Sequence, residues 1–108
     1  MFKSVVFCGL LVLTAAPAFA SAQSTRITDV DYLRLSRCAA YNAAPGYATD
    51  RAADLAQKAK SQARGRSSVI SQKATDDGEA ISRSIRKVKD EAGIMGLKVK
   101  RDEACAGF

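Results

Sequence analysis

The sequence contains no histidine, which excludes Ser-His-Asp and Cys-His catalytic constellations and every histidine metal site. After the first twenty residues the only cysteines are Cys38 and Cys105, too far apart for a Cys-x-x-Cys redox motif and too few for a structural zinc site. Ser84 and Lys87 match an S-x-x-K motif, but the further motifs and the large framework of penicillin-recognising enzymes are missing. We therefore predict a protein that is not an enzyme and that uses no metal and no cofactor.

Large apolar side chains are also scarce. There is no tryptophan, the only phenylalanine after the first twenty residues is Phe108, and alanine supplies much of the hydrophobic content. No segment after residue 20 alternates apolar and polar positions as a strand does, so an all-α fold is predicted. A small helical domain with so thin a core has little net stability unless a covalent link or a partner adds to it.

Residues 1–20 contain the longest apolar run of the sequence and have the organisation of a secretory signal peptide. Lys3 gives the positively charged start, and apolar residues dominate positions 5–13. Ala18 and Ala20 then give the small-x-small pattern that signal peptidase cleaves. The apolar run is far shorter than the ~20 residues of a membrane-spanning helix, so we favour a cleaved signal over a retained membrane anchor.

Cleavage after Ala20 leaves 88 of the 108 residues, and cleavage after Ala22, the alternative, leaves 86. Either length suits one small domain, predicted at 28–108 behind a flexible leader at 21–27. No second apolar run follows, so the processed protein is predicted to have no transmembrane segment and to be periplasmic or secreted. Without Lys3, 16 basic residues stand against 11 acidic ones, a net charge of about +5.

Cys38 and Cys105 are the cysteines that the processed chain keeps. An even pair in a small exported chain is most simply one disulfide, with intermolecular pairing or free thiols as the alternatives. An intramolecular bond closes a span of 67 residues, for which the chain-entropy model gives roughly 4 kcal/mol of stabilisation.

Apolar positions at helical spacing predict three helices, at about 28–43, 49–76 and 79–104. Thr28 suits the N-cap of the first helix, with Asp31 in its first turn, and Pro45-Gly46 ends it. A mostly alanine stripe continues the second helix as far as the polar run at 75–78, where capping residues separate it from the third.

Three helices of these lengths predict an up-down-up bundle, in which the third helix returns along the second and ends level with the end of the first. Cys38 lies near the end of the first helix and Cys105 near the end of the third, so this topology brings the two together. A separation of more than about 7 Å between their Cα atoms would contradict the disulfide.

The third predicted helix carries a heptad seam, a set of apolar residues at alternating spacings of four and three: Ile81, Ile85, Val88, Ala92, Met95 and Val99. Opposite charges four residues apart flank the seam, as at Glu79 and Arg83 and at Lys87 and Glu91. A seam of this kind packs a helix against another helix. Our leading hypothesis is a non-enzymatic helical module that binds an unknown protein partner or self-associates.

Eight basic residues on the second and third predicted helices are candidate anion-binding residues: Lys58, Lys60, Arg64, Arg66, Arg83, Arg86, Lys87 and Lys89. A polyanion can contact such residues through its phosphates. No aromatic residues lie among them, which disfavours a specific nucleic-acid site. An electrostatic binder of an anionic surface or polymer is therefore the alternative function, and a solvated helix face neutralised by intrahelical pairs is the structural alternative.

Three tyrosines, Tyr32, Tyr41 and Tyr47, fall in or just after the first predicted helix. We expect them to cover the end of the alanine-lined bundle, with an exposed binding patch as the alternative.

Overall fold

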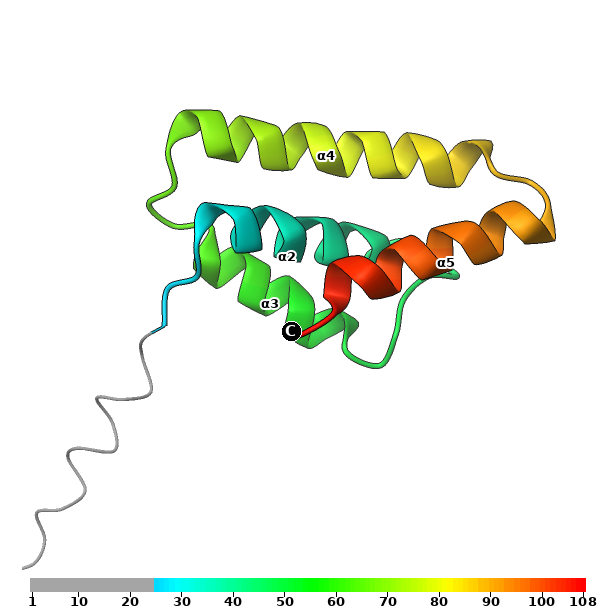
Figure 1. Cartoon of the computed structure of the whole chain (residues 1–108), viewed down its shortest axis with the longest axis horizontal. Helices are drawn as coiled ribbons and strands as arrows, with labels where there is room; N and C mark the ends of the chain where they lie inside the picture. The colour runs from blue at the N-terminus through cyan, green and yellow to red at the C-terminus, as the bar shows by residue number, and fades with distance from the viewer. Residues whose placement is uncertain (1–24) are drawn as a thin grey trace, which may run out of the picture.

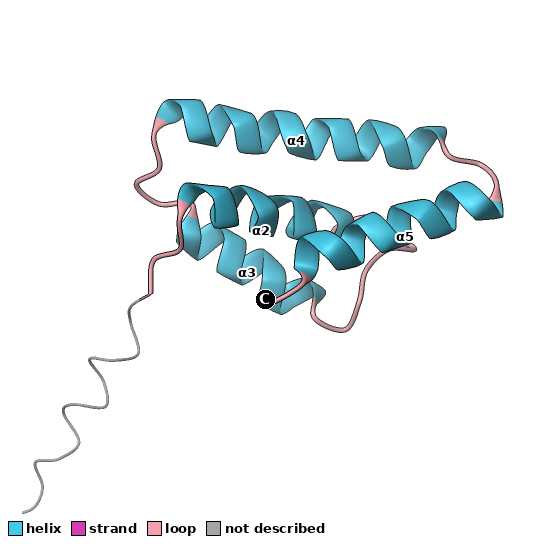
Figure 2. Cartoon of the chain, viewed as in Figure 1, coloured by secondary structure: helices cyan, strands magenta, loops and turns pink. Residues whose placement is uncertain are grey.

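The computed structural model describes residues 25–108, and within this range the chain forms four helices and no strand (Figure 2). The helices are α2 at Asp29–Asn42, α3 at Ala52–Gln62, α4 at Ser68–Lys87 and α5 at Glu91–Cys105. The predicted signal peptide at 1–20, its cleavage sites and leader residues 21–24 lie outside the described residues. The all-α prediction is confirmed for the described part, whereas the division into three helices is wrong.

α2 begins and ends where local chemistry predicts. The Thr28 hydroxyl accepts a hydrogen bond from the backbone N–H of Asp31 at 3.1 Å and so caps the first turn. The helix ends at Asn42, and Gly46 then turns the chain with a φ of +89°, a conformation that favours glycine.

α3 and α4 replace the predicted helix at 49–76. α3 ends at Gln62 because Gly65 adopts a φ of +76°, which takes the chain out of the helix. Ser67 then caps α4, since its hydroxyl accepts a hydrogen bond from the backbone N–H of Ile70 at 3.3 Å. Gly65 therefore stops the helix, although the predicted helix at 49–76 runs through it.

α4 passes without a break through the polar run at 75–78, so the predicted boundary there is wrong. The Asp77 carboxylate lies 2.7 Å from Lys73 Nζ, one turn earlier, and 3.4 Å from Arg37 Nη1 on α2. These contacts hold Asp77 within the helix. Ala74 and Ile81, buried and seven residues apart, lie on the same face of α4 as Asp77.

The break falls later, between α4 and α5. Val88 is extended, and the Asp90 side chain accepts a hydrogen bond from the backbone N–H of Gly93 at 3.0 Å, which caps α5. The predicted helix at 79–104 is therefore two helices, the end of α4 and the whole of α5.

α2 is the central helix and packs against each of the other three (Figure 1). Successive helices alternate in direction, so the bundle is up-down-up-down and not the predicted up-down-up. One core cluster joins α2, α3 and α5 and contains Leu35, Cys38, Leu55 and Ala104. A second joins α2, the following loop, α4 and α5 and contains Tyr41, Tyr47, Ile81 and Leu97. All three tyrosines are buried, so the exposed tyrosine patch does not form.

The predicted disulfide is confirmed, because Cys38 and Cys105 are bonded with their Cα atoms 4.9 Å apart. Beside it, the buried Asn42 amide donates to the Cys38 carbonyl oxygen at 3.0 Å. The Asn42 side-chain oxygen accepts from the Thr49 backbone N–H at 2.8 Å and from its hydroxyl at 2.7 Å. Asn42 thus fastens the connection between α2 and α3 next to the disulfide.

The last residues of the predicted leader lie against α3. Gln62 donates from Nε2 to the Thr25 carbonyl oxygen at 3.0 Å and accepts from the Ile27 N–H at 3.2 Å. Ile27 also packs on the first core cluster, so packed structure begins before the predicted domain start at residue 28.

Candidate functional site

The heptad seam is not one continuous face. Ile81 is buried in the second core cluster, and Ile85 and Val88 pack against the same cluster. Ala92, Met95 and Val99, by contrast, are exposed on α5, Met95 at 58% and Val99 at 53%. The first half of the seam is therefore covered inside the chain, and the second half faces solvent.

The capped turn between the helices explains this division. A heptad register continues only while the helix does, and here it ends at Lys87 and restarts at Glu91. On the restarted helix, Ile94 and Leu97 take the inward positions against the second core cluster. The residues of the predicted seam are thereby turned to the outside of α5.

The outward residues form a compact surface, which we call the α5 apolar face: Ala92, Met95, Gly96 and Val99. They are spaced by three and four residues and so share one side of the helix. A Cβ added at Gly96 meets no atom within 4 Å, so the backbone is open to close approach there. Small residues at 92 and 96 between the longer Met95 and Val99 give the shape on which another helix packs.

The basic residues of α3 and its following loop do not form one site. Lys58, Lys60 and Arg64 are exposed. Arg66 has a side chain only 4% exposed, and it lies 2.8 Å from Asp29 Oδ1. Its guanidinium is used inside the fold, which removes Arg66 from the candidate anion-binding residues.

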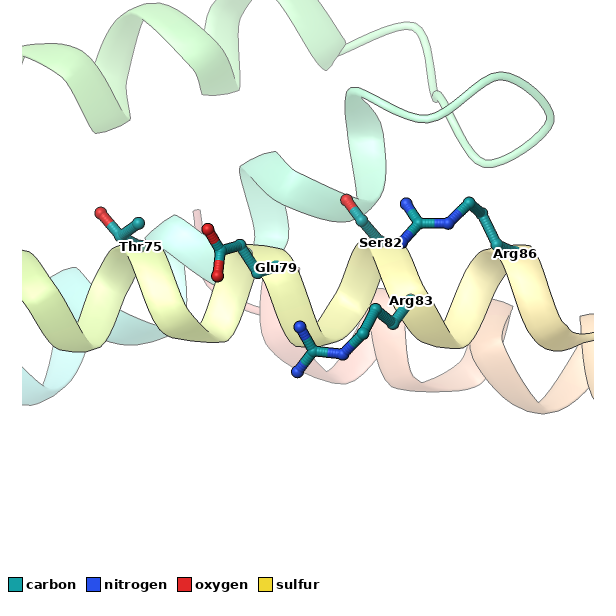
Figure 3. Close-up of a pocket in the computed structure, with 6 residues that line it drawn as sticks. Thr75, Glu79, Ser82, Arg83 and Arg86 are labelled. Atoms are coloured by element: carbon teal, nitrogen blue, oxygen red, sulfur yellow. The ribbon is translucent and has the colours of Figure 1, made fainter.

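Arg83, Arg86 and Lys87 near the end of α4 and Lys89 in the turn that follows are all exposed, and we call this group the α4 basic face although its members point to different sides of the helix end. The predicted neutralising pairs of Glu79 with Arg83 and of Lys87 with Glu91 are absent from the salt bridges of residues 25–108. The helix break separates the second pair. Figure 3 shows the first pair on opposite edges of the α4 ribbon.

A shallow hollow of ≈ 480 Å³ lies over the same part of α4. Thr75, Glu79, Ser82 and Arg86 line one edge of the helix, and Arg83 reaches across the other (Figure 3). The mixture of cations with one carboxylate on a single helix makes it an open polar surface, without the enclosure of a small-molecule pocket.

A third surface was missed by the sequence analysis. A cleft of ≈ 410 Å³ lies between α2 and α5 and is lined by Arg34, Arg37, Tyr41, Lys100, Glu103 and Ala104. We call it the α2–α5 cleft. Arg34, Arg37 and Tyr41 follow one another at spacings of three and four, so they share one side of α2. The disulfide holds that side of α2 against α5. Because the disulfide is predictable from the sequence, it is the signal that could have placed Arg34, Arg37 and Tyr41 near Lys100 and Glu103.

The polar groups that line this cleft have different surroundings. Arg34 donates to the carbonyl oxygens of Ala104 and Ala106, and its guanidinium carbon lies 4.4 Å from the centroid of the Phe108 ring. Its charge thus lies at the C-terminal end of α5, where cations are favoured. Burial raises the pKa of the Tyr41 hydroxyl, although nearby Arg37 acts in the opposite direction.

Within residues 25–108, no group of three or more acidic or cysteine side chains is arranged to hold a metal ion. None of the four helices in that range has the length and apolar character needed to cross a bilayer. No family model matches the chain, and neither a curated protein nor a solved structure shows a match to it.

Proposed function

We propose that this protein is an exported, non-enzymatic interaction module that binds a helix of another protein, or of a second copy, through the α5 apolar face. The observation that carries this proposal is the exposure of Met95 and Val99 within an apolar repeat whose other half packs against the second core cluster. A disulfide suits the oxidising conditions of the periplasm or of the cell exterior. The lack of histidine in the whole chain supports a non-enzymatic role.

Met95→Glu tests the proposal, because a carboxylate buried in a helix–helix contact without a partner weakens association by at least about tenfold. The fold is expected to survive, since exposed positions change stability by only about 0.5 kcal/mol. Val69→Glu is the matched control, because Val69 is an exposed apolar residue on α4, away from this face.

Photo-crosslinking in the exporting cell gives the readout. A photoreactive residue at Val99 is expected to form one dominant product, which Met95→Glu removes and Val69→Glu retains. A product of twice the chain mass identifies self-association, and any other mass identifies a partner protein. The proposal is wrong if sedimentation shows a strict monomer and no product depends on Met95.

A second candidate function, electrostatic binding of an anionic surface or polymer, is favoured by the unpaired cations of the α4 basic face. It predicts binding to vesicles of an anionic phospholipid that weakens steeply as salt rises. Reversing Arg83, Arg86 and Lys87 to glutamate is expected to abolish this binding. The matched control reverses three exposed cations of the α3 region, Lys58, Lys60 and Arg64, for the same change in net charge; equal losses in both variants would show an effect of net charge alone.

A further inference from the structure

We propose that the α2–α5 cleft is a binding site for a small oxyanion, a carboxylate or phosphate group, held by the Tyr41 hydroxyl, Arg37 and Lys100. Lys100 and Glu103 lie four residues after Gly96 and Val99, so the site adjoins the end of the α5 apolar face on the same side of α5. It shares no residue with that face or with the α4 basic face, and its test is distinct from the tests of both proposed functions. The shared chemistry of the two ligand types is a compact, negatively charged group that accepts hydrogen bonds from a hydroxyl and from cationic nitrogens.

The first observation is a largely buried tyrosine whose hydroxyl has no protein partner. As a residue Tyr41 is only 7% exposed, and its hydroxyl forms no hydrogen bond with another group among residues 25–108. Buried hydroxyls in folded proteins are nearly always hydrogen-bonded, because leaving one unpaired is unfavourable. A group that enters the cleft from solvent can accept the bond that Tyr41 lacks.

The position of the hydroxyl gives the second observation. The aromatic ring of Tyr41 belongs to the second core cluster, while the residue also lines the α2–α5 cleft. The charges that act on its hydroxyl are those of Arg37 and Glu103, which line the same cleft. The hydroxyl end of the side chain therefore lies on the cleft side. Since burial raises its pKa, the hydroxyl keeps its proton at neutral pH and remains a hydrogen-bond donor.

The charge of the cleft selects an anion. Three cations, Arg34, Arg37 and Lys100, line it together with one carboxylate, Glu103. Arg34 is bound to the end of α5, but Lys100 is exposed and has no salt bridge with any residue of 25–108. Arg37 has only a 3.4 Å contact with Asp77 and is 40% exposed, so its remaining donors are open to a ligand. A volume of ≈ 410 Å³ accommodates a small organic anion as well as a free one.

The Glu103 carboxylate limits the kind of anion. It repels a second negative group and accepts hydrogen bonds from a hydroxyl or ammonium group. The preferred ligand therefore has one oxyanion with a donor group beside it. Serine carries a carboxylate with both donors, acetate carries the carboxylate alone, and inorganic phosphate carries the other oxyanion. These three compounds are the probes.

The experiment is a titration of the disulfide-bonded protein with each probe at constant ionic strength, followed by amide chemical shifts in NMR. Saturable shifts confined to the cleft-lining parts of α2 and α5 are expected. Tyr41→Phe removes only the hydroxyl and is expected to weaken binding about tenfold, as does Lys100→Gln. Lys98→Gln, which removes an equal charge from the same helix outside the cleft, leaves the affinity unchanged.

Stability without ligand separates this role from a structural one. If the Tyr41 hydroxyl awaits a ligand, Tyr41→Phe keeps or raises the melting temperature in anion-free buffer, because no hydrogen bond is lost. The proposal is overturned if no probe gives a saturable response. It is also overturned if Tyr41→Phe and Lys98→Gln respond alike, or if Tyr41→Phe lowers stability in the absence of anions.

Discussion

Arg66→Gln tests the reassignment of Arg66 from a surface cation to a structural residue. In the fold, its guanidinium lies 2.8 Å from Asp29 Oδ1 and donates to the Ile27 carbonyl oxygen at 2.9 Å. It donates also to the Gln62 carbonyl oxygen at 2.9 Å. The guanidinium carbon lies 4.7 Å from the centroid of the Tyr32 ring. Arg66 thus joins the start of α2 to the end of α3.

The loss of stability expected for Arg66→Gln follows from these contacts. Hydrogen bonds from a charged group contribute about 1.5–3 kcal/mol each when they are shielded from water. The contact with Asp29 is discounted, because that carboxylate is more than half exposed and surface ion pairs contribute less than about 1 kcal/mol. The two carbonyl contacts and the ring contact together give a loss of about 3 kcal/mol. In a domain of this size such a loss lowers Tm by about 15 °C.

Thermal melts of the disulfide-bonded protein, followed by circular dichroism, measure the effect. Arg64→Gln is the matched control, because Arg64 is exposed and, within residues 25–108, only its backbone carbonyl is hydrogen-bonded, by Arg26, while its guanidinium has no partner. We expect that variant to change stability by no more than about 0.5 kcal/mol. Equal melting temperatures for Arg66→Gln and Arg64→Gln would refute the structural role. Weaker binding to anionic vesicles in Arg66→Gln alone, with unchanged stability, would return Arg66 to the anion-binding set.

Four further tests address other parts of the fold. Replacing Cys38 and Cys105 by alanine removes the closure of a 67-residue span and lowers the free energy of unfolding by about 4 kcal/mol; a loss below about 1 kcal/mol in urea denaturation would contradict the chain-entropy account. Gly96→Ala is expected to raise stability by about 0.5–1 kcal/mol, because the position lies inside α5 with open space around an added Cβ. Gly93→Ala is expected to lower it, because the added Cβ comes within 2.8 Å of the carboxylate that caps α5; thermal melts in which both variants shift the same way would contradict this cap geometry. Burial raises the pKa of the Tyr41 hydroxyl above its ordinary value near 10, so the folded protein holds this proton more tightly than the unfolded chain does. The contribution of Tyr41 to the free energy of unfolding is therefore retained below about pH 10 and is lost as the pH rises further. If denaturant titrations show the free energy of unfolding of Tyr41→Phe falling as steeply above about pH 10 as that of the unmodified protein, Tyr41 is not the cause of the loss.

Local signals predicted the first helix well. Thr28 as N-cap and Pro45-Gly46 as breaker act within a few residues, so the sequence alone reveals them. Gly65 and Ser67 are signals of the same kind, but the alanine stripe that continues past them outweighed them. A glycine inside a helix and a glycine that ends one are told apart by φ, and φ depends on how the next helix packs.

The polar run at 75–78 failed as a predictor for a different reason. Asp77 is held in α4 partly by Arg37, which is 40 residues away in the chain and lies on α2. No local pattern reports such a contact. The apolar spacing gave the better signal, because Ile70, Ala74, Ile81 and Ile85 form one inward stripe across the supposed boundary.

The two candidate surfaces on α5 also differ in whether they depend on local or on long-range contacts. Exposure of Met95 and Val99 depends on a cap at Asp90 that rotates the second half of an otherwise regular repeat. The α2–α5 cleft depends instead on the Cys38–Cys105 bond, which fixes the register between two helices. Because that bond was predictable, the proximity of α2 and α5 was predictable too. The lack of a partner for the Tyr41 hydroxyl was not predictable from the sequence, because every side chain around the cleft has to be placed before such a lack can be seen.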